Sequence, residues 1–528
     1  MKKITFCFLL LLVSQIVTGQ HLSVEKKNIF IEKALAFRSQ ENYKAAINQL
    51  DSILKHNPQD AKIILFKGDL SLQAKLFDQA ITTYKQLLPL SFETTIARIN
   101  ISYALFMAHK PGKALGFAKM AFEKDSSNAN AIINYFNALL WNLKTKNAGD
   151  FLEGQKKRLN PNQVLILKAR LNTSSGNYKV GLQNYDSLLV YYPNKDYIKE
   201  YTEVLIGKKE IATATGIFKS KDSLFSQNET IAFNQKIKAS KLQNSGLEFV
   251  YFKDIASNVR TEQSVWWQQG EGNILKLRLS VGNSSISSIE QLKTTSQFLN
   301  IALNQRWNAA WSGESVAHFQ KIKTSDNQSF NGVTGKQTLQ FQPNDRRMFG
   351  LSASSDILNF TASLLEKNIR SQNFGYVSHI MFSGKTGFYT QGSYSYLTDK
   401  NKRKQFFGSI YHLFRTEPTL KAGYNFSALI FEKRTVNYFA PSQYKSQEIF
   451  IDFGTASSSK YFVLSQAAIG LQKIEIQKLQ FSGRIQIEAG YKTKHVDASI
   501  KYQTSNTASA SGAGYSFNWY TARVIVKW

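Results

Sequence analysis

The side chains of this sequence that could carry out catalysis do not form a complete motif. Residues 383–386, Ser-Gly-Lys-Thr, match the end of a phosphate-binding loop, but His379 stands where that loop requires its first glycine. The sequence also lacks the paired histidines of a zinc protease, the Asp-rich loop of a calcium site and the G-x-S-x-G motif of a hydrolase. We therefore expect no enzymatic activity, no cofactor and no metal site.

The basic side chains carry more information than these incomplete motifs. The chain has 528 residues, with 66 Lys and Arg against 37 Asp and Glu, which gives a formal net charge of +29. A charge of this size is typical of proteins that bind nucleic acid or another anionic partner. The single cysteine excludes a disulfide framework and a thiolate metal cluster. What the charge means depends on which segments carry it.

The first 19 residues have the layout of a secretory signal peptide. Two lysines precede an apolar run from Ile4 to Val13, and small residues at 17–19 provide a cleavage site. The run is too short to span a bilayer comfortably, so a retained membrane anchor is the less favoured alternative. The only cysteine, Cys7, lies within this run. We predict an exported chain, and this prediction argues against nucleic acid as a partner.

A 34-residue period predicts that residues 20–218 form a solenoid of tetratricopeptide repeats. Small side chains recur at this interval, at Ala46, Ala80, Ala114 and Ala148. Each such repeat is a helix hairpin, and small side chains at fixed positions let its two helices approach closely. A fifth unit has slipped by one residue, and a sixth unit near Ala214 is degenerate. We interpret residues 219–245 as a closing helix and linker, with the linker itself near 244–246.

After residue 246 the period of the apolar residues changes to two. Leucines at 275, 277 and 279 alternate with Lys276 and Arg278, and a similar run covers residues 479–491. Strict alternation predicts strands with one apolar and one polar face. Aromatic residues gather near the ends of these runs, and prolines, which interrupt hydrogen-bond ladders, are rare.

Two architectures fit such strands, a soluble sandwich and a transmembrane barrel. We favour an antiparallel barrel over residues 246–528, because closure leaves no free strand edge. The predicted last strand, residues 519–528, places the terminal Trp528 on its apolar face, which resembles the C-terminal signal of outer-membrane barrels. At roughly 18 residues per strand and connection, the segment holds about 16 strands, with 14 or 18 as alternatives. An even number of strands places both chain ends of the barrel segment, and therefore the repeats, on the periplasmic side.

The polar face of these strands carries charge that could select a cargo. The barrel segment has a net charge of +14 and the solenoid +13. We predict that five basic residues face the lumen: Lys276, Arg278, Arg484, Arg523 and Lys527. A positive lumen favours anions or an anionic polymer. The alternative is that basic side chains at the rim, such as residues 402–404 and 433–434, contact acidic lipid head groups of the outer membrane.

One segment places aromatic residues around a proline just before a predicted strand at 447–453. It contains Tyr438, Phe439, Pro441 and Tyr444. A strand-entry turn would explain this pattern. The segment also resembles a Tyr-Phe-Ser-Pro-x-x-Tyr element in outer-membrane exopolysaccharide export proteins of the cellulose and poly-N-acetylglucosamine type, with Ala440 in place of the serine. Those proteins share the order of signal peptide, periplasmic repeats and barrel, and the order is also similar to the YaiO-type barrel family.

These features favour a non-enzymatic outer-membrane protein whose solenoid gathers a partner or polymer and whose barrel is a port or anchor. The resemblance implies that the exported polymer is an exopolysaccharide. Aromatic and basic side chains in a pore are suited to sugar rings and their acidic groups. The alternative is an envelope scaffold whose repeats bind a periplasmic protein while the barrel tethers it. A third hypothesis, an outer-membrane lipid hydrolase that uses His412, competes with a structural role for that histidine.

Overall fold

The computed structural model of the protein shows helices followed by a β-barrel. Two compact units divide at Leu167. The predicted signal peptide, residues 1–19, lies outside the described residues. The structure describes residues 22–270, 275–288, 292–308, 310–456, 459–507 and 516–528.

Paired helices make up the first unit. Several helices begin after an Asn or Asp whose side chain accepts a backbone hydrogen bond, as Asp60 does from the backbone N of Ile63 at 3.3 Å. The helices are α1 (Val24–Ser39), α2 (Tyr43–Leu54), α3 (Ala61–Gln73), α4 (Phe77–Lys85), α5 (Thr94–Met107), α6 (Pro111–Lys124), α7 (Ala129–Trp141), α8 (Thr145–Gln155), the 3₁₀ helix η1 (Lys156–Arg158) and the start of α9 (Pro161–Ser174).

Small side chains hold the helix pairs close together. All four repeat-packing alanines, Ala46, Ala80, Ala114 and Ala148, are completely buried. Gly68 on α3 shows the same constraint, because a Cβ atom there would lie 2.5 Å from Cε1 of Tyr84. The Tyr84 hydroxyl in turn donates to Asp69 Oδ1 at 2.6 Å. The period of small residues therefore corresponds to the contacts that close each hairpin.

Helices continue into the second unit as two further hairpins and a closing helix. The segment predicted to be degenerate, near Ala214, is a complete hairpin, and a stack of three rings, Phe218, Phe225 and Phe233, joins it to the closing helix. None of the helices in the described part of the chain is long and apolar enough to cross a membrane. The helices are α10 (Tyr178–Tyr191), α11 (Lys195–Gly207), α12 (Ile211–Lys219), η2 (Asp222–Leu224) and α13 (Gln227–Ser240).

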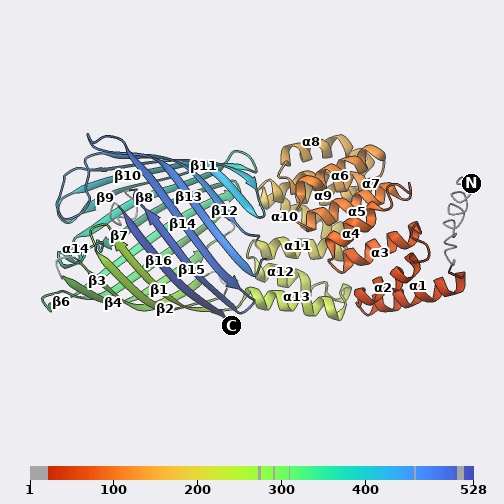
Figure 1. Ribbon diagram of the computed structural model, residues 1–528, viewed down its shortest axis with the longest axis horizontal. Helices are drawn as coiled ribbons and strands as arrows, with labels where there is room; N and C mark the ends of the chain where they lie inside the picture. Colours follow the sequence, from red (N-terminus) through yellow and green to blue (C-terminus); the bar gives the residue numbers. More distant parts are fainter. Residues whose placement is uncertain (1–21, 271–274, 289–291, 309, 457–458, 508–515) are drawn as a thin grey trace, which may run out of the picture. The chain divides into compact units, whose positions relative to one another are not determined.

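Sixteen antiparallel strands then form a closed barrel, in which each strand pairs with its neighbours in sequence and β1 pairs with β16 (Figure 1). The predicted fold class and strand number are confirmed. The strands are β1 (Asn244–Asp254), β2 (Val259–Gln268), β3 (Leu275–Ser287), β4 (Lys293–Arg306), β5 (Trp311–Lys323), β6 (Ser329–Asn344), β7 (Arg347–Ile357), β8 (Arg370–Met381), β9 (Thr386–Leu397), β10 (Lys402–Arg415), β11 (Thr419–Phe431), β12 (Tyr444–Gly454), β13 (Tyr461–Ile474), β14 (Gln480–Lys492), β15 (Val496–Ser505) and β16 (Phe517–Lys527).

The predicted linker at residues 244–246 is wrong, because these residues already belong to β1. Asn244 pairs with Lys527 and Gly246 with Ile525 of β16. Their polar and small side chains indicate a turn when only neighbours in sequence are considered. The partner strand lies at the other end of the barrel segment, so local composition does not reveal the pairing. The connection between α13 and β1 is therefore residues 241–243.

Alternation gives the barrel wall two chemically different faces. Outward side chains such as Leu247, Val265 and Val281 are about half exposed, whereas inward ones such as Trp266 are buried. We name the two ends by the chain. The near end is the end at which β1 begins and β16 ends. These two points lie at the same end because the number of antiparallel strands is even. The far end is the opposite one. An apolar outer face with all strands paired is what a lipid bilayer requires of a barrel.

The far end carries the one helix that the structure describes within the barrel segment, α14 (Ala362–Glu366), in the connection between β7 and β8 (Figure 1). Thr361 caps this helix by accepting a hydrogen bond from the backbone N of Leu364 at 3.1 Å. Two adjacent leucines of α14 enter two separate apolar clusters. Leu364 packs with the ends of β9, β11 and β12, and Leu365 packs with those of β3 and β5. The connection that carries α14 therefore crosses the far mouth.

Candidate functional site

The inner wall of the barrel holds all five basic residues that the sequence places in the lumen. Each alternates with outward side chains that are exposed and apolar, such as Leu275, Ile485 and Val524. Lys276 and Arg278 lie on β3, Arg484 on β14, and Arg523 and Lys527 on β16.

Most of these cations lie beside a carboxylate of the adjacent strand or of the next strand but one. Arg523 Nη2 is 3.1 Å from Glu488 Oε1, and Arg484 Nη2 is 3.7 Å from Glu448 Oε2. Each pair lowers the potential that either charge would generate alone. Further pairs on the same wall are Lys527–Asp497 (2.6 Å), Lys421–Asp452 (2.7 Å) and Lys336–Glu314 (3.5 Å).

Every acidic residue of the sixteen strands points inward. Arg278 and Lys501 also face inward and form no ion pair within 4 Å with the other described residues. The inner wall therefore carries many paired charges, and its basic side chains outnumber its acidic ones. The acidic residues are Glu248, Asp254, Glu262, Glu314, Asp356, Glu448, Asp452, Glu488 and Asp497.

Arg278 stacks on an aromatic ring close to the near end of the barrel. Its Cζ atom lies 4.4 Å from the ring centroid of Trp266 on β2. That ring fills the space above Gly246, where a Cβ would lie 2.6 Å from indole atoms. Only a glycine lets the indole lie flat against the wall. A guanidinium on an aromatic face keeps its charge while its edge stays free to donate hydrogen bonds.

A second aromatic and cationic cluster lies on β8 to β12. The Tyr411 hydroxyl is 2.7 Å from His379 Nε2, and Lys421 Nζ lies 5.0 Å from the Tyr411 ring centroid. Here too the ring covers a glycine, Gly387, where a Cβ would lie 2.4 Å from the Tyr411 hydroxyl. Tyr389 extends this row of rings.

The two clusters lie on opposite walls. β3 and β11 are eight positions apart in a ring of sixteen, so Arg278 and Lys421 are placed across the barrel from each other. Both lie within four residues of the near end of their strands. The near half of the barrel therefore presents rings and cations on both sides, an arrangement that suits polyhydroxylated and anionic chains.

The four residues of the exopolysaccharide-like element lie at the far end instead. Burial raises the pKa of Tyr438, and its hydroxyl donates to Asp399 Oδ2 at 2.8 Å. Tyr444 is completely buried and donates to Gln472 Oε1 at 3.0 Å. The carbonyl of Pro441 accepts from the backbone N of Phe431 at 2.9 Å, and the Phe439 ring meets that of Tyr444 edge-on. The element anchors the loop before β12.

This loop and the α14 connection share an apolar cluster. Tyr438, Ala440 and Tyr444 pack with Leu364 of α14 and Leu358. The element therefore contributes to the seat of the segment that crosses the far mouth. A strand-entry turn, the simpler interpretation, describes its position in the chain but not these contacts.

The candidate catalytic residues border the second cluster but do not belong to it. His412 points outward near the near end, where its Nδ1 is 2.9 Å from Thr386 Oγ1 and its ring meets Phe414 edge-on. Residues 383–386 form a turn between β8 and β9, in which Ser383 Oγ accepts from the backbone N of Lys385 at 3.1 Å. These contacts are those of a structural histidine and a capped turn.

Of the rim residues considered for lipid contact, one faces inward. Arg403 on β10 donates to Asn373 Oδ1 at 3.2 Å and to Ser395 Oγ, both inside the barrel. The residues on either side, Lys402 and Lys404, point outward because of the strand alternation. A run of three basic residues in a strand is therefore divided between the two faces.

Fold and inner wall together define a class, a β-barrel of membrane-spanning type that follows helical repeats. The family model described as "Tetratricopeptide repeat" matches residues 37–94. No curated protein matches the chain. The prediction that tetratricopeptide repeats precede a barrel is confirmed by the family match and the strand topology.

Solved structures similar to this chain include a barrel protein and repeat proteins. A "bacterial polysaccharide outer membrane secretin" is 7% identical with a TM-score of 0.44, over 55% of this chain and 99% of its own. A thermophilic TPR protein of Thermus thermophilus is 18% identical with a TM-score of 0.30, over 34% and 99% of the two chains. A tetratricopeptide repeat protein of Parabacteroides merdae is 14% identical with a TM-score of 0.32, over 40% and 86%.

Proposed function

We propose that the protein is a non-enzymatic port of the outer membrane through which a polymer, with an exopolysaccharide as the leading candidate, leaves the periplasm. In this proposal the near end and the repeats face the periplasm, and the far end faces the exterior. The observation that carries the proposal is the inner wall, where rings and cations on opposite sides line the near half of a closed barrel.

The charges of the inner wall support a polymer that carries some acidic groups. Paired cations such as Arg523 can exchange Glu488 for a passing carboxylate, and the excess cations attract such groups from solution. The flat rings of Trp266 and Tyr411 offer faces on which sugar rings can stack. The inner wall thus combines the two kinds of contact that an acidic polysaccharide makes.

Conductance of the purified full chain in planar bilayers tests the port. We expect small or intermittent current from the wild type, because the α14 connection crosses the far mouth. Replacing residues 359–368 with a short Gly-Ser loop should raise the single-channel conductance severalfold. A barrel that stays closed to ions in both forms would contradict the port. It would leave the alternative in which the barrel only anchors the repeats.

Charge reversal tests whether the inner basic residues select anions. Arg278→Glu and Arg484→Glu in the loop-replaced protein should shift the reversal potential toward cations, because each replaces an inner positive charge with a negative one. Lys445→Glu is the matched control, since Lys445 points outward from β12 and should leave selectivity unchanged.

The alternative function is an envelope scaffold, in which the repeats bind a protein and the barrel only anchors them. Exposed apolar side chains on the helices favour it, among them Tyr103 on α5 and the pair Val190 and Tyr191 on α10. Crosslinking in intact cells distinguishes the two, because a scaffold should capture one protein through positions beside Tyr103 whether or not polymer is made.

A further inference from the structure

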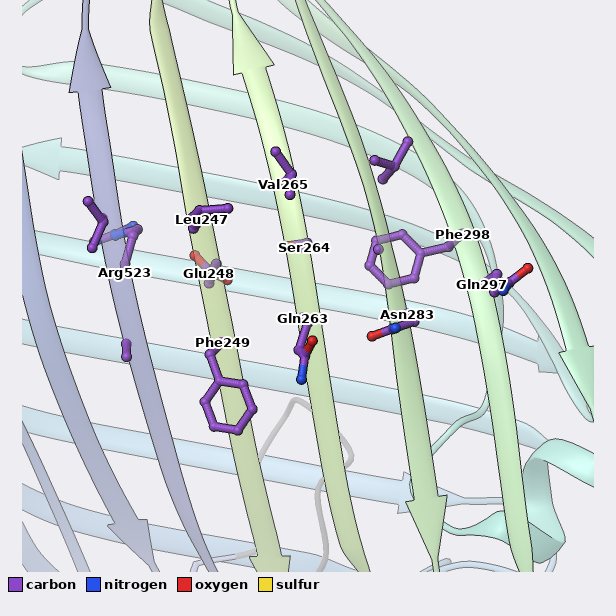
Figure 2. A pocket seen from close by; sticks show the side chains of 14 residues that line it. Leu247, Glu248, Phe249, Gln263, Ser264, Val265, Asn283, Gln297, Phe298 and Arg523 are labelled. Carbon is purple, nitrogen blue, oxygen red and sulfur yellow. The ribbon is translucent and has the colours of Figure 1, made fainter.

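A groove runs along the outer wall of the barrel over β16 and β1 to β4. Figure 2 shows this wall with strands of the opposite wall behind it. The open groove has a volume of about 740 Å³. Its outward lining has an apolar part that includes Leu247, Val265 and Val281 and a polar part formed by Gln263, Asn283 and Gln297. The inward residues Glu248 and Arg523 also border it.

The apolar part is a continuous row of side chains across neighbouring strands. Leu247 pairs with Val524 on one side and Val265 on the other, and Val265 pairs with Val281. The row continues through Leu299 to Phe319. All of these side chains are exposed on the barrel surface. A surface of this kind is suited to the acyl chains of a bilayer.

The polar part is the next outward row toward the far end. Gln263 pairs with Asn283, and Asn283 pairs with Gln297, so their side chains are direct neighbours. All three are exposed, and none of them makes a side-chain hydrogen bond to another residue in the described part of the chain. Unsatisfied amides that face hydrocarbon cost free energy. The row therefore requires a polar group from outside the chain.

Two lysines continue the amide row. Gln297 pairs with Lys321 of β5, and Lys323 is the next outward residue of that strand. Both are exposed and form no ion pair within the described residues. Every acidic residue of the strands points inward, so no strand carboxylate on this wall can neutralise them. The group that satisfies the amides should therefore be an anion that accepts hydrogen bonds.

We propose that this groove binds a phosphorylated lipid of the membrane leaflet at the far end. Its phosphate accepts hydrogen bonds from the amides of Asn283 and Gln297 and faces Lys321. An acyl chain lies along the apolar row at Val265 and Val281. The inference goes beyond the port, although it rests on the same membrane-spanning barrel. Neighbouring side chains of one row lie roughly 5 Å apart, a spacing that one phosphate can bridge.

Native mass spectrometry of the delipidated full chain in detergent tests this proposal, with diphosphorylated lipid A as the probe. We expect one tightly held lipid per chain. Lys321→Gln with Lys323→Gln should weaken binding by about fivefold for each lysine removed. Asn283→Leu should weaken it as well, without any change in charge. The matched control is Lys445→Gln with Lys473→Gln, an outward pair that faces across β12 and β13 away from the groove.

Several outcomes would overturn the lipid site. They are equal binding of the same lipid without phosphates, equal loss in the control pair, displacement of the lipid by millimolar inorganic phosphate, and a lipid-free dimer that covers the groove. A heat-dependent gel shift of each variant reports whether the barrel is folded. Absence of that shift in the wild type would contradict the barrel and hence the port. A shift that is retained without lipid binding would contradict only the proposed lipid site.

Discussion

Individual glycines in this protein mark places where an aromatic ring lies flat against the backbone. Gly68 lies under Tyr84 in the repeats, and Gly246 and Gly387 lie under Trp266 and Tyr411 in the barrel. The rings differ in their surroundings, but the requirement is the same, because any Cβ would overlap ring atoms. The same feature fixes helix packing in one unit and presents ring faces in the other.

Gly68→Ala should destabilise the helical repeats. The new methyl group would lie 2.5 Å from the Tyr84 ring, and overpacking of this kind costs about 1–3 kcal/mol. Thermal unfolding followed by circular dichroism at 222 nm measures the change. Gly116→Ala on α6 is the control, because its Cβ would meet nothing within 4 Å, and it should raise stability by up to about 1 kcal/mol.

Glu229 should make the stability of α13 depend on pH. Hydrogen bonds from Lys195 and Lys199, and then from the backbone of Ser226, hold the pKa of Glu229 well below its usual value. A carboxylate with a lowered pKa stabilises the folded state fully above its unfolded pKa. This contribution declines as the pH falls below about 4.5 and is lost completely only when the pH passes below the lowered pKa of the folded state.

Glu229→Gln should therefore remove about 0.5–1 kcal/mol at pH 7, a value reduced by solvent screening, and less at pH 3, where part of the contribution is already lost. Unfolding midpoints at the two pH values provide the measurement. Glu32→Gln on the exposed face of α1 serves as the comparison. Equal losses at both pH values would assign the effect of Glu229 to the helix cap rather than to its charge.

Elements that depend on one strand or one hairpin could be predicted from the sequence, and elements held by distant contacts could not. Ala46 and Ala80 reveal the repeats because their spacing is local, and Lys276 and Arg278 reveal a polar face for the same reason. Nothing near Leu364 in the sequence indicates that α14 packs against β9 and β12. The carboxylate partners of the inner cations, such as Glu448, were also missed, because cross-strand partners follow from register.

Weakening the seat of α14 should open the far mouth without removing any residue. Leu365 is 2% exposed and packs with Ile286 and Ile322 of the barrel wall. Leu365→Asn places an amide in this cluster, so the connection should leave its seat more often. Longer open times in bilayer recordings are the expected result. Lys385→Asn, in the near-end turn between β8 and β9, should leave the open times unchanged.

The closed barrel should govern how the whole molecule behaves in detergent. The strands form a ring joined by the β1–β16 pairing, in which Asn244 pairs with Lys527. Such a ring opens only when many hydrogen bonds break together. The unheated full chain should therefore migrate differently from the boiled chain on a denaturing gel, and identical migration would contradict a closed barrel.

The ion pairs of the inner wall bear on how long any cargo would stay. An acidic group that takes Arg523 from Glu488 leaves a free carboxylate beside it, which competes to restore the original pair. The gain in free energy from each such exchange is small, since one ionic contact replaces another. Such a wall therefore binds each acidic residue of a passing chain only weakly and releases it readily. Transit is then favoured over capture.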